Sequence, residues 1–188
     1  MKVQIVQYDP SWENKFSQEK SDLLKILSFL NIEIEHIGST SIKGLGAKPI
    51  IDIILGVDNY DKLDLLADKM VKSHFTYYRI YNNIMPERRL FSKMSHPNNI
   101  EQPEYLDEDQ ISPRNRGFII TVNCHCVVKN SPFWQRHIFF RDYLRNNDKV
   151  RNDYNNLKIQ LSQKDWTQIN DYTDAKTEFI KSIESKMI

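Results

Sequence analysis

Residues 35–56 read EHIGSTSIKGLGAKPIIDIILG, and this stretch decides the fold because it joins two predicted strands through four of the chain's five glycines. A chain so poor in glycine uses it where the backbone needs a positive φ or must approach another group closely. Polar side chains that suit an anionic ligand lie between these glycines, namely Ser39, Thr40, Ser41, Lys43 and Lys48. We therefore expect the function of the chain to centre on this segment.

A strand is predicted on each side of the glycine-rich turn. Ile32, Ile34 and Ile37 indicate a strand that runs into Gly38, and residues 50–57 form a short β-branched run typical of a buried strand. Because side chains alternate along a strand, Asp52 should point to the face opposite Ile51 and its neighbours. The sequence thus predicts a carboxylate on a largely apolar strand.

The rest of the pattern predicts mixed strands and helices, followed by helices alone. Further strands are expected at 3–5, 75–81, 89–94 and 117–128, and helices at 10 to about 30, 61–73, 132–146, 148–163 and 165–186. Residues 95–116, with the acidic stretch 101–109, are expected to form a loop, either a solvated excursion or a lid. This order favours one α/β domain (an α+β mixed sheet) over residues 1–188, with a sheet core at about 1–128 and a C-terminal helical appendage at about 131–187.

Composition excludes several classes of protein. The 26 Lys and Arg residues nearly balance 25 Asp and Glu residues, so there is no global signal for nucleic-acid binding. No apolar run reaches the roughly 18 residues of a transmembrane helix, and residues 1–10 do not resemble a signal peptide. We expect a cytoplasmic protein without a membrane partner, in which Cys124 and Cys126 are reduced and buried. Nothing in the composition identifies a protein partner.

Two interpretations of the glycine-rich turn stay open. Backbone N–H groups at Gly38, Ser39 and Thr40 can form an anion-binding nest, and Lys43 and Lys48 can add positive charge. The alternative is an ordinary turn with no ligand, because the spacing matches neither a P-loop nor a dinucleotide fingerprint. The combination of turn, lysines and following carboxylate favours a site for a nucleotide or another phosphorylated small molecule.

Asp52 is the sharpest single candidate. A carboxylate on a buried strand costs several kcal/mol unless it is paired or bound to a metal. It can form a salt bridge to Lys48 or an arginine, or it can hold Mg²⁺ together with Glu35 and His125. His125 is likewise either a structural histidine or a catalytic acid or base.

The predicted helix at 132–146 carries a line of cations opposite its apolar stripe. His137, Arg141 and Arg145 follow each other at four-residue spacing and need an anion to offset their repulsion. Asp142, Asp148, the acidic loop and a ligand phosphate are the alternatives, and Lys158 on the next helix can join the line. The pattern does not separate an internal ion-pair network from a ligand site.

At this point the sequence resembles the GrpB family over nearly its whole length. The resemblance rests on Tyr8-Asp9-Pro10-x-Trp12, on residues 35–45, 47–53 and 140–145, and on Tyr154, Leu157-Lys158, Tyr172 and Lys176. It implies a nucleotidyltransferase-like fold. In that superfamily a Gly-Ser turn grips a triphosphate, and carboxylates on following strands hold Mg²⁺.

Carried over residue by residue, Gly38 and Ser39 match the phosphate-binding turn and Asp52 matches the first carboxylate. Ile54 stands where the second carboxylate is expected. In the family's His-x-His segment, Asn123 replaces the first histidine, and His125 is the histidine that remains.

Three hypotheses follow for the function. The first is a metal-dependent transferase that moves a nucleotidyl or phosphoryl group to an unknown acceptor, with Asp52 and His125 as catalytic residues. In it Gly38, Ser39, Thr40, Lys43, Lys48, Arg141 and Arg145 bind the phosphates, and Asp52, Glu35 and His125 bind the metal. The second is a binding module for a nucleotide or phosphometabolite without turnover, motivated by the missing carboxylates. The third is a regulatory protein whose C-terminal helices dock a partner.

Overall fold

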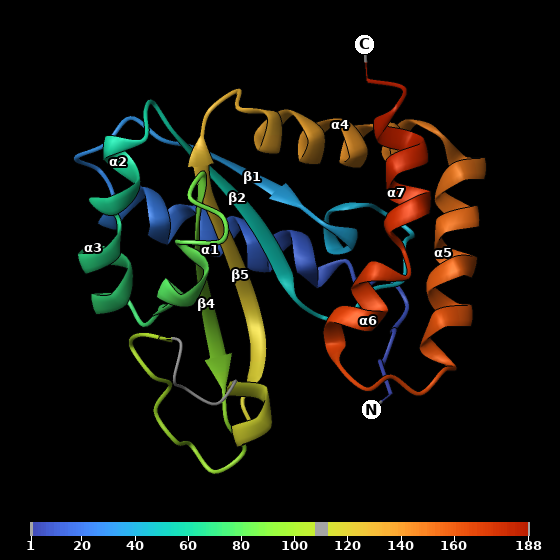
Figure 1. The fold of residues 1–188 in the computed structure, drawn as a ribbon, viewed down its shortest axis with the longest axis horizontal. Coiled ribbons are helices and arrows are strands. Elements are labelled where there is room, and N and C mark those ends of the chain that lie inside the picture. Colours follow the sequence, from blue (N-terminus) through green and yellow to red (C-terminus); the bar gives the residue numbers. More distant parts are fainter. Residues whose placement is uncertain (1, 108–112, 188) are drawn as a thin grey trace.

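A five-stranded mixed sheet organises the chain, for which the computed structural model describes residues 2–107 and 113–187 (Figure 1). The strand order is β1-β2-β5-β4-β3, and only β2 and β5 run parallel among these strand pairs. The strands are β1 (Glu33–Ile37), β2 (Ile51–Val57), β3 (Thr76–Tyr77), β4 (Arg88–Ser95) and β5 (Ile119–Val128). The predicted mixed α/β fold is confirmed.

The helices precede, interrupt and follow this sheet. They are α1 (Ser11–Ile26), α2 (Asp61–Asp64), α3 (Ala67–Lys72), α4 (Pro132–Asn146), α5 (Asp148–Ser162), α6 (Ile169–Asp174) and α7 (Thr177–Glu184), with single turns of 3₁₀-helix at η1 (Ser39–Ser41), η2 (Arg79–Tyr81) and η3 (Pro113–Arg116). Within the described ranges, no helix is long and apolar enough to cross a membrane.

Several predicted elements differ from the structure. The helix expected to reach about residue 30 ends at Ile26, and of the strand expected at 75–81 only β3 (Thr76–Tyr77) forms, followed by η2. The helix expected at 61–73 is broken into α2 and α3, and Leu63, Leu66 and Met70 are fully buried against the sheet. The helix expected at 165–186 is divided into α6 and α7. No strand forms at 3–5; instead Val6 and Ala47 exchange two backbone hydrogen bonds of 2.9 Å as an isolated bridge.

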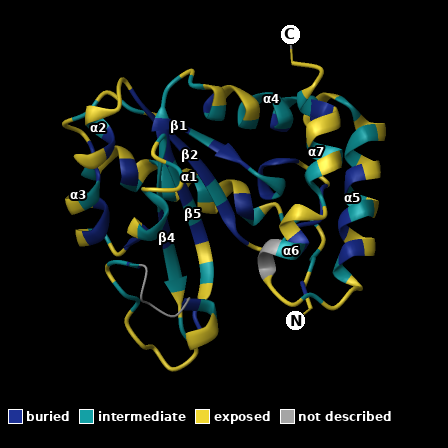
Figure 2. Cartoon of the chain, viewed as in Figure 1, coloured by how far each residue is buried: buried dark blue, intermediate teal, exposed yellow. Residues whose placement is uncertain are grey.

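One face of the sheet holds the main core. Ile51, Ile53, Leu55, Cys124 and Cys126 point to this face, where they pack against α1, α2 and α3 in the dark-blue interior of Figure 2. Their alternation with Asp52 and Asn123 follows the predicted period of two. Both cysteines are free and buried, as predicted.

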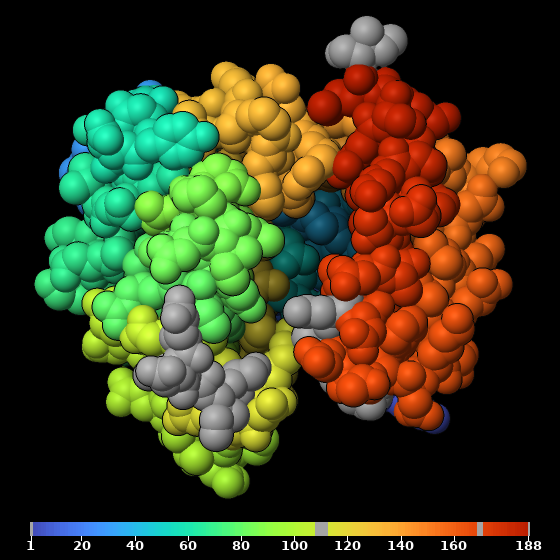
Figure 3. All heavy atoms as spheres, in the orientation of Figure 1, coloured from blue at the N-terminus to red at the C-terminus, as the bar shows by residue number. Residues whose placement is uncertain are grey.

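The opposite face is covered only in part. Trp134 of α4 packs on Ile37, Ile54 and Val127 and closes one end of this face. Figure 3 shows that the surface is hollowed farther along, between the green segments beside β4 and the red and orange C-terminal helices. This hollow leaves the Asp52 end of the sheet open to a ligand.

The acidic stretch forms irregular structure where it is described. Arg79 makes two hydrogen bonds to Asp107, at 2.8 and 2.6 Å, and so ties the stretch to η2. The predicted loop is confirmed for residues 96–107, which contain no helix or strand longer than a single bridge at Tyr105. Residues 108–112 of the predicted loop lie outside the described residues.

Candidate functional site

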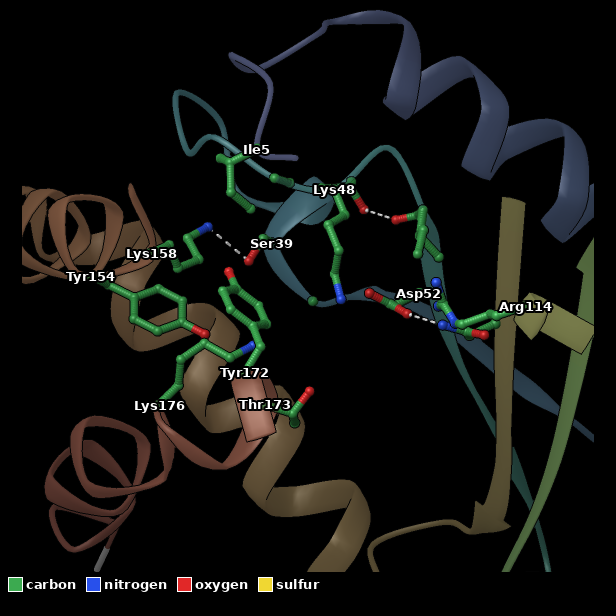
Figure 4. A pocket seen from close by; sticks show the side chains of 15 residues that line it. Ile5, Ser39, Lys48, Asp52, Arg114, Tyr154, Lys158, Tyr172, Thr173 and Lys176 are labelled. Atoms are coloured by element: carbon green, nitrogen blue, oxygen red, sulfur yellow. Dashed lines mark hydrogen bonds between the residues drawn. The ribbon is translucent and has the colours of Figure 1, made fainter. Parts of the chain in front are cut away.

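A cavity of about 300 Å³ opens in the hollow beside the glycine-rich turn (Figure 4). Its walls come from the turn after β1, from β2 and β5, from η3, and from α5 with the α6–α7 segment. The polar side chains that line it are Ser39, Thr40, Lys48, Asp52, Arg114, Asn123, Tyr154, Lys158, Tyr172, Thr173 and Lys176. Segments more than a hundred residues apart in sequence therefore meet in one small space.

The turn at Gly38 accepts no other residue without strain. Gly38 has φ +69° and ψ −176°, a combination that only glycine adopts readily. A Cβ atom there would lie 2.5 Å from Oδ2 of Asp52, so glycine also makes room for this carboxylate. The Thr40 hydroxyl donates to the carbonyl of Ile50 at 3.0 Å and contacts Nε2 of His36 at 3.0 Å. These two contacts hold the turn in place.

Asp52 belongs to a hydrogen-bonded row on the open face of the sheet. Nδ2 of Asn123 donates to Oδ1 of Asp52 at 2.9 Å, and the Ser92 hydroxyl donates to Oδ1 of Asn123 at 2.8 Å. Because an ionised carboxylate only accepts hydrogen bonds, the Asp52 contact defines which way the Asn123 amide faces. Burial raises the pKa of Asp52, against the opposing effects of the Asn123 hydrogen bond and of the charges on Lys48, Lys176 and Arg114.

Three lysines bring positive charge to the cavity. Burial lowers the pKa of Lys158 to about 7, with a further contribution from Lys176, and burial with the charge of Lys48 lowers the pKa of Lys176 to about 8. Burial and the charge of Arg114 also lower the pKa of Lys48. An anion between these lysines would relieve the cost of burying their charges.

Two tyrosines support the lysines through their ring faces. Nζ of Lys176 lies 4.6 Å and Nζ of Lys48 5.3 Å from the ring centroid of Tyr172, while Nζ of Lys158 lies 5.0 Å from that of Tyr154. Such cation–π contacts stabilise partly desolvated cations. Lys158 also donates to the Ser39 hydroxyl at 3.0 Å and to the carbonyl of Gly46, and so links α5 to the turn.

Arg141 and Arg145 hold the turn from outside the cavity. The buried guanidinium of Arg141 donates to Glu35 at 2.5 Å, to the carbonyl of His36 at 3.0 Å, and to Asp142 at 2.7 Å. Arg145 donates twice to the carbonyl of Ser41, at 3.1 and 2.8 Å. The arginine line of α4 is therefore built into an internal network with Glu35 and Asp142.

The remaining predicted site residues do not meet Asp52 in the cavity. His125 shares its sheet face but lies two positions beyond Asn123 on β5, about 7 Å away along the strand. Its Nδ1 contacts Nη1 of Arg88 at 3.1 Å, and burial with the charge of Arg88 lowers its pKa. Lys43 is exposed and lines no part of the cavity.

The described residues contain no metal-binding cluster. No group of three His, Cys, Asp or Glu side chains within 2–107 and 113–187 is arranged to hold a metal ion. Glu35, Asp52 and His125, the predicted ligands, each have a different partner: Arg141, Asn123 and Arg88. Asp52 is the single carboxylate among the described residues that line the cavity, and cations flank it. Asp52 is thus the one carboxylate that these described residues could offer to Mg²⁺, and the magnesium site stays a prediction.

Comparison with known proteins places the chain in a family. The profile of the GrpB protein family matches residues 2–186. The chain belongs to the GrpB family. It is 30% identical to the glutamate-rich protein GrpB of Alkalihalophilus pseudofirmus over 98% of this chain and 95% of that protein. The crystal structure of the conserved protein GrpB from Enterococcus faecalis superimposes with a TM-score of 0.75 at 30% identity, over 97% of this chain and 96% of that one.

Reasoning from local sequence missed half of this GrpB-family cavity. The glycine-rich segment does not supply the polar side chains from η3, β5 and the C-terminal helices, and of these the local pattern indicated Lys158 alone, as an addition to the cations of 132–146. They are Arg114, Asn123, Tyr154, Lys158, Tyr172, Thr173 and Lys176. The family resemblance was the available signal, because Tyr154, Lys158, Tyr172 and Lys176 belong to the residues that carry it. Their local patterns are those of ordinary amphipathic helices.

Proposed function

We propose that the chain binds a small phosphate-bearing molecule in the cavity between the glycine-rich turn and the C-terminal helices. One observation carries the proposal: Lys48, Lys158 and Lys176 come from three separate segments, and all line one cavity that contains one carboxylate. Their lowered pKa values reflect buried positive charge that a phosphate would offset. The Gly38–Ser39 turn adds backbone and hydroxyl groups on the same side.

The geometry favours binding over metal-dependent transfer. The described lining residues include one carboxylate, and His125 is engaged with Arg88 outside the cavity. Transfer with Asp52 and His125 as catalytic residues stays a prediction with its own assay. If the chain is a transferase of that kind, incubation of ATP with the protein and Mg²⁺ should release pyrophosphate or phosphate. Asp52→Asn should abolish this release.

A docking role for the C-terminal helices has less support. Among the described residues from α4 onward, the large apolar side chains with marked exposure are Ile159 and Met187. Single exposed apolar residues are usual on a protein surface and do not indicate an interface.

Calorimetric titration with inorganic phosphate and pyrophosphate, without metal, tests the proposal. We expect saturable binding at millimolar or lower concentration for the wild-type chain. Lys176→Met should weaken it about tenfold or more, since a charge-assisted hydrogen bond is worth roughly 1.5–3 kcal/mol. Lys181→Met is the matched control, because Lys181 is exposed one turn farther along α7. Absence of binding up to 10 mM, or equal losses in both variants, would contradict the proposal.

A further inference from the structure

The cavity has two chemically different ends. Figure 4 shows Ser39, Lys158, Tyr172 and Lys176 on one side and Asp52 with Arg114 on the other. Lys48 lies between them and points toward Asp52. A simple inorganic anion would bind at the lysine side, and the Asp52 carboxylate would then face the anion. The arrangement therefore suits a ligand whose two ends differ.

A buried hydroxyl without a partner lies at the lysine end. Tyr172 is 1% exposed, and its hydroxyl has no hydrogen-bond partner among the described residues, although it lines the cavity. Figure 4 shows this hydroxyl pointing toward the side of the cavity formed by Ser39 and Lys158. A buried donor left unpaired costs about 1–3 kcal/mol, so a ligand oxygen at this point would satisfy it.

Asp52 can accept a hydrogen bond from the ligand. Oδ1 receives the Asn123 amide, and the other oxygen, Oδ2, lies against Gly38 with acceptor capacity left. Lys48, Lys176 and Arg114 all act on this carboxylate, so a ligand ammonium placed here would be repelled by three cations. A neutral hydroxyl donates without that repulsion.

The size of the cavity limits the ligand. Its volume of about 300 Å³ is at the lower end of small-molecule sites and equals roughly ten water molecules. This volume accommodates a phosphate and a short chain or one ring. A larger molecule such as a nucleoside triphosphate would extend from the cavity into the open hollow.

We propose that the ligand is a phosphate monoester of a small hydroxylated molecule. Its phosphate lies between Lys158, Lys176 and the Tyr172 hydroxyl, and one of its hydroxyl groups donates to Asp52. This inference rests on the proposed phosphate site and assigns the chemical class of its ligand.

Three phosphate monoesters of similar size test the assignment by calorimetry. Glycerol 3-phosphate carries the hydroxyl groups, propyl phosphate lacks them, and 2-aminoethyl phosphate replaces them with an ammonium. We expect glycerol 3-phosphate to bind about tenfold more tightly than propyl phosphate, as a hydrogen bond to a charged group predicts. We expect 2-aminoethyl phosphate to bind no better than propyl phosphate.

Asp52→Asn separates this role from a structural one. The variant removes a negative charge from a phosphate site, so propyl phosphate should bind more tightly to it than to the wild type. The preference for glycerol 3-phosphate should fall at least threefold at the same time. A damaged fold would weaken both ligands, and thermal unfolding of the variant checks for such damage.

Tyr172→Phe tests the phosphate end, with the exposed Tyr60→Phe as its control. It should weaken inorganic phosphate about threefold to tenfold, whereas the control should leave phosphate affinity unchanged.

The outcomes are distinct. If none of the phosphates binds, the proposed function itself fails. If the phosphates bind but glycerol 3-phosphate and propyl phosphate bind equally, the phosphate site stands and the hydroxyl assignment is overturned. Tighter binding of 2-aminoethyl phosphate would overturn it in favour of a cationic ligand. Unchanged phosphate affinity in Tyr172→Phe would remove the tyrosine from the site.

Discussion

Replacement of Gly38 by alanine tests the geometry that joins the turn to Asp52. The φ of +69° with ψ of −176° lies in a region that costs a non-glycine residue about 1–3 kcal/mol. The new Cβ would also lie 2.5 Å from Oδ2 and 2.9 Å from Cβ of Asp52, and overpacking of this kind costs roughly a further 1–3 kcal/mol. Gly38→Ala should therefore destabilise the chain by about 2–6 kcal/mol.

Gly44→Ala is the matched control, because it also places an alanine at a positive φ but brings no Cβ atom against Asp52. Gly44 has φ +80° in the same segment, but a Cβ there would meet no atom within 4 Å. Gly44→Ala should therefore reduce the free energy of unfolding only by the cost of the backbone conformation, about 1–2 kcal/mol.

Thermal unfolding measures the difference between the two variants. For a chain of this length, 1 kcal/mol corresponds to roughly 2–4 °C in Tm, so Gly38→Ala should unfold several degrees below Gly44→Ala. Equal Tm values would show that Asp52 does not press on the turn, and the close approach described for this site would then be wrong.

Three further perturbations have calculable signs. Arg141→Met leaves the buried His36 carbonyl and the partly exposed Glu35 without their partner and should cost about 1–3 kcal/mol in urea unfolding, whereas Arg136→Met, which breaks a more exposed ion pair, should cost less than about 1 kcal/mol. The folded pKa of Lys158, about 7, lies below its ordinary 10.5, so the unfolded state binds more protons between these values and the free energy of unfolding rises with pH across this window. Lys158→Met should flatten that rise when stability is measured from pH 7 to 10; an unchanged slope would refute the lowered pKa. Asn123→Asp replaces a donor to Asp52 by a second carboxylate and should destabilise by roughly 1–3 kcal/mol at pH 8 and by less at pH 4–5, where the pair retains a proton; an equal loss at both pH values would contradict this reasoning.

Local chemistry explains which elements could be predicted from the sequence. The alternation of Ile51, Asp52 and Ile53 predicts which side chains of β2 face the core, because neighbouring side chains of a strand point to opposite faces of the sheet and one face is buried. The predicted bounds of α4 agree with the structure at both ends. Its start is determined by Ser131, whose hydroxyl accepts the N–H of Trp134, and by a proline at the first helical position.

The arrangement around Asp52 could not be predicted in the same way. Arginines spaced four residues apart on α4 look alike whether they face a ligand or a carboxylate, and docking of α4 beside β1 decides the matter by placing Glu35 against Arg141. In the same way, no local pattern shows that Lys158 contacts the glycine-rich turn or that Lys176 lies near Asp52. Tertiary packing determines their neighbours, and the sequence reports only their spacing.

The C-terminal helices line the cavity together with the glycine-rich segment. The glycine-rich segment alone supplies a turn, one lysine and one carboxylate, which is too little positive charge to hold a phosphate dianion. Lys158 and Lys176 supply the remaining charge, and Lys158 reaches the turn itself through Ser39 and Gly46. Burial of these ammonium groups opposes folding, and the proposed anion would offset this cost. Packing of α5 and the α6–α7 segment against the turn buries these charges, and an anion would lower that cost. We therefore expect anion binding and the packing of these helices to stabilise each other.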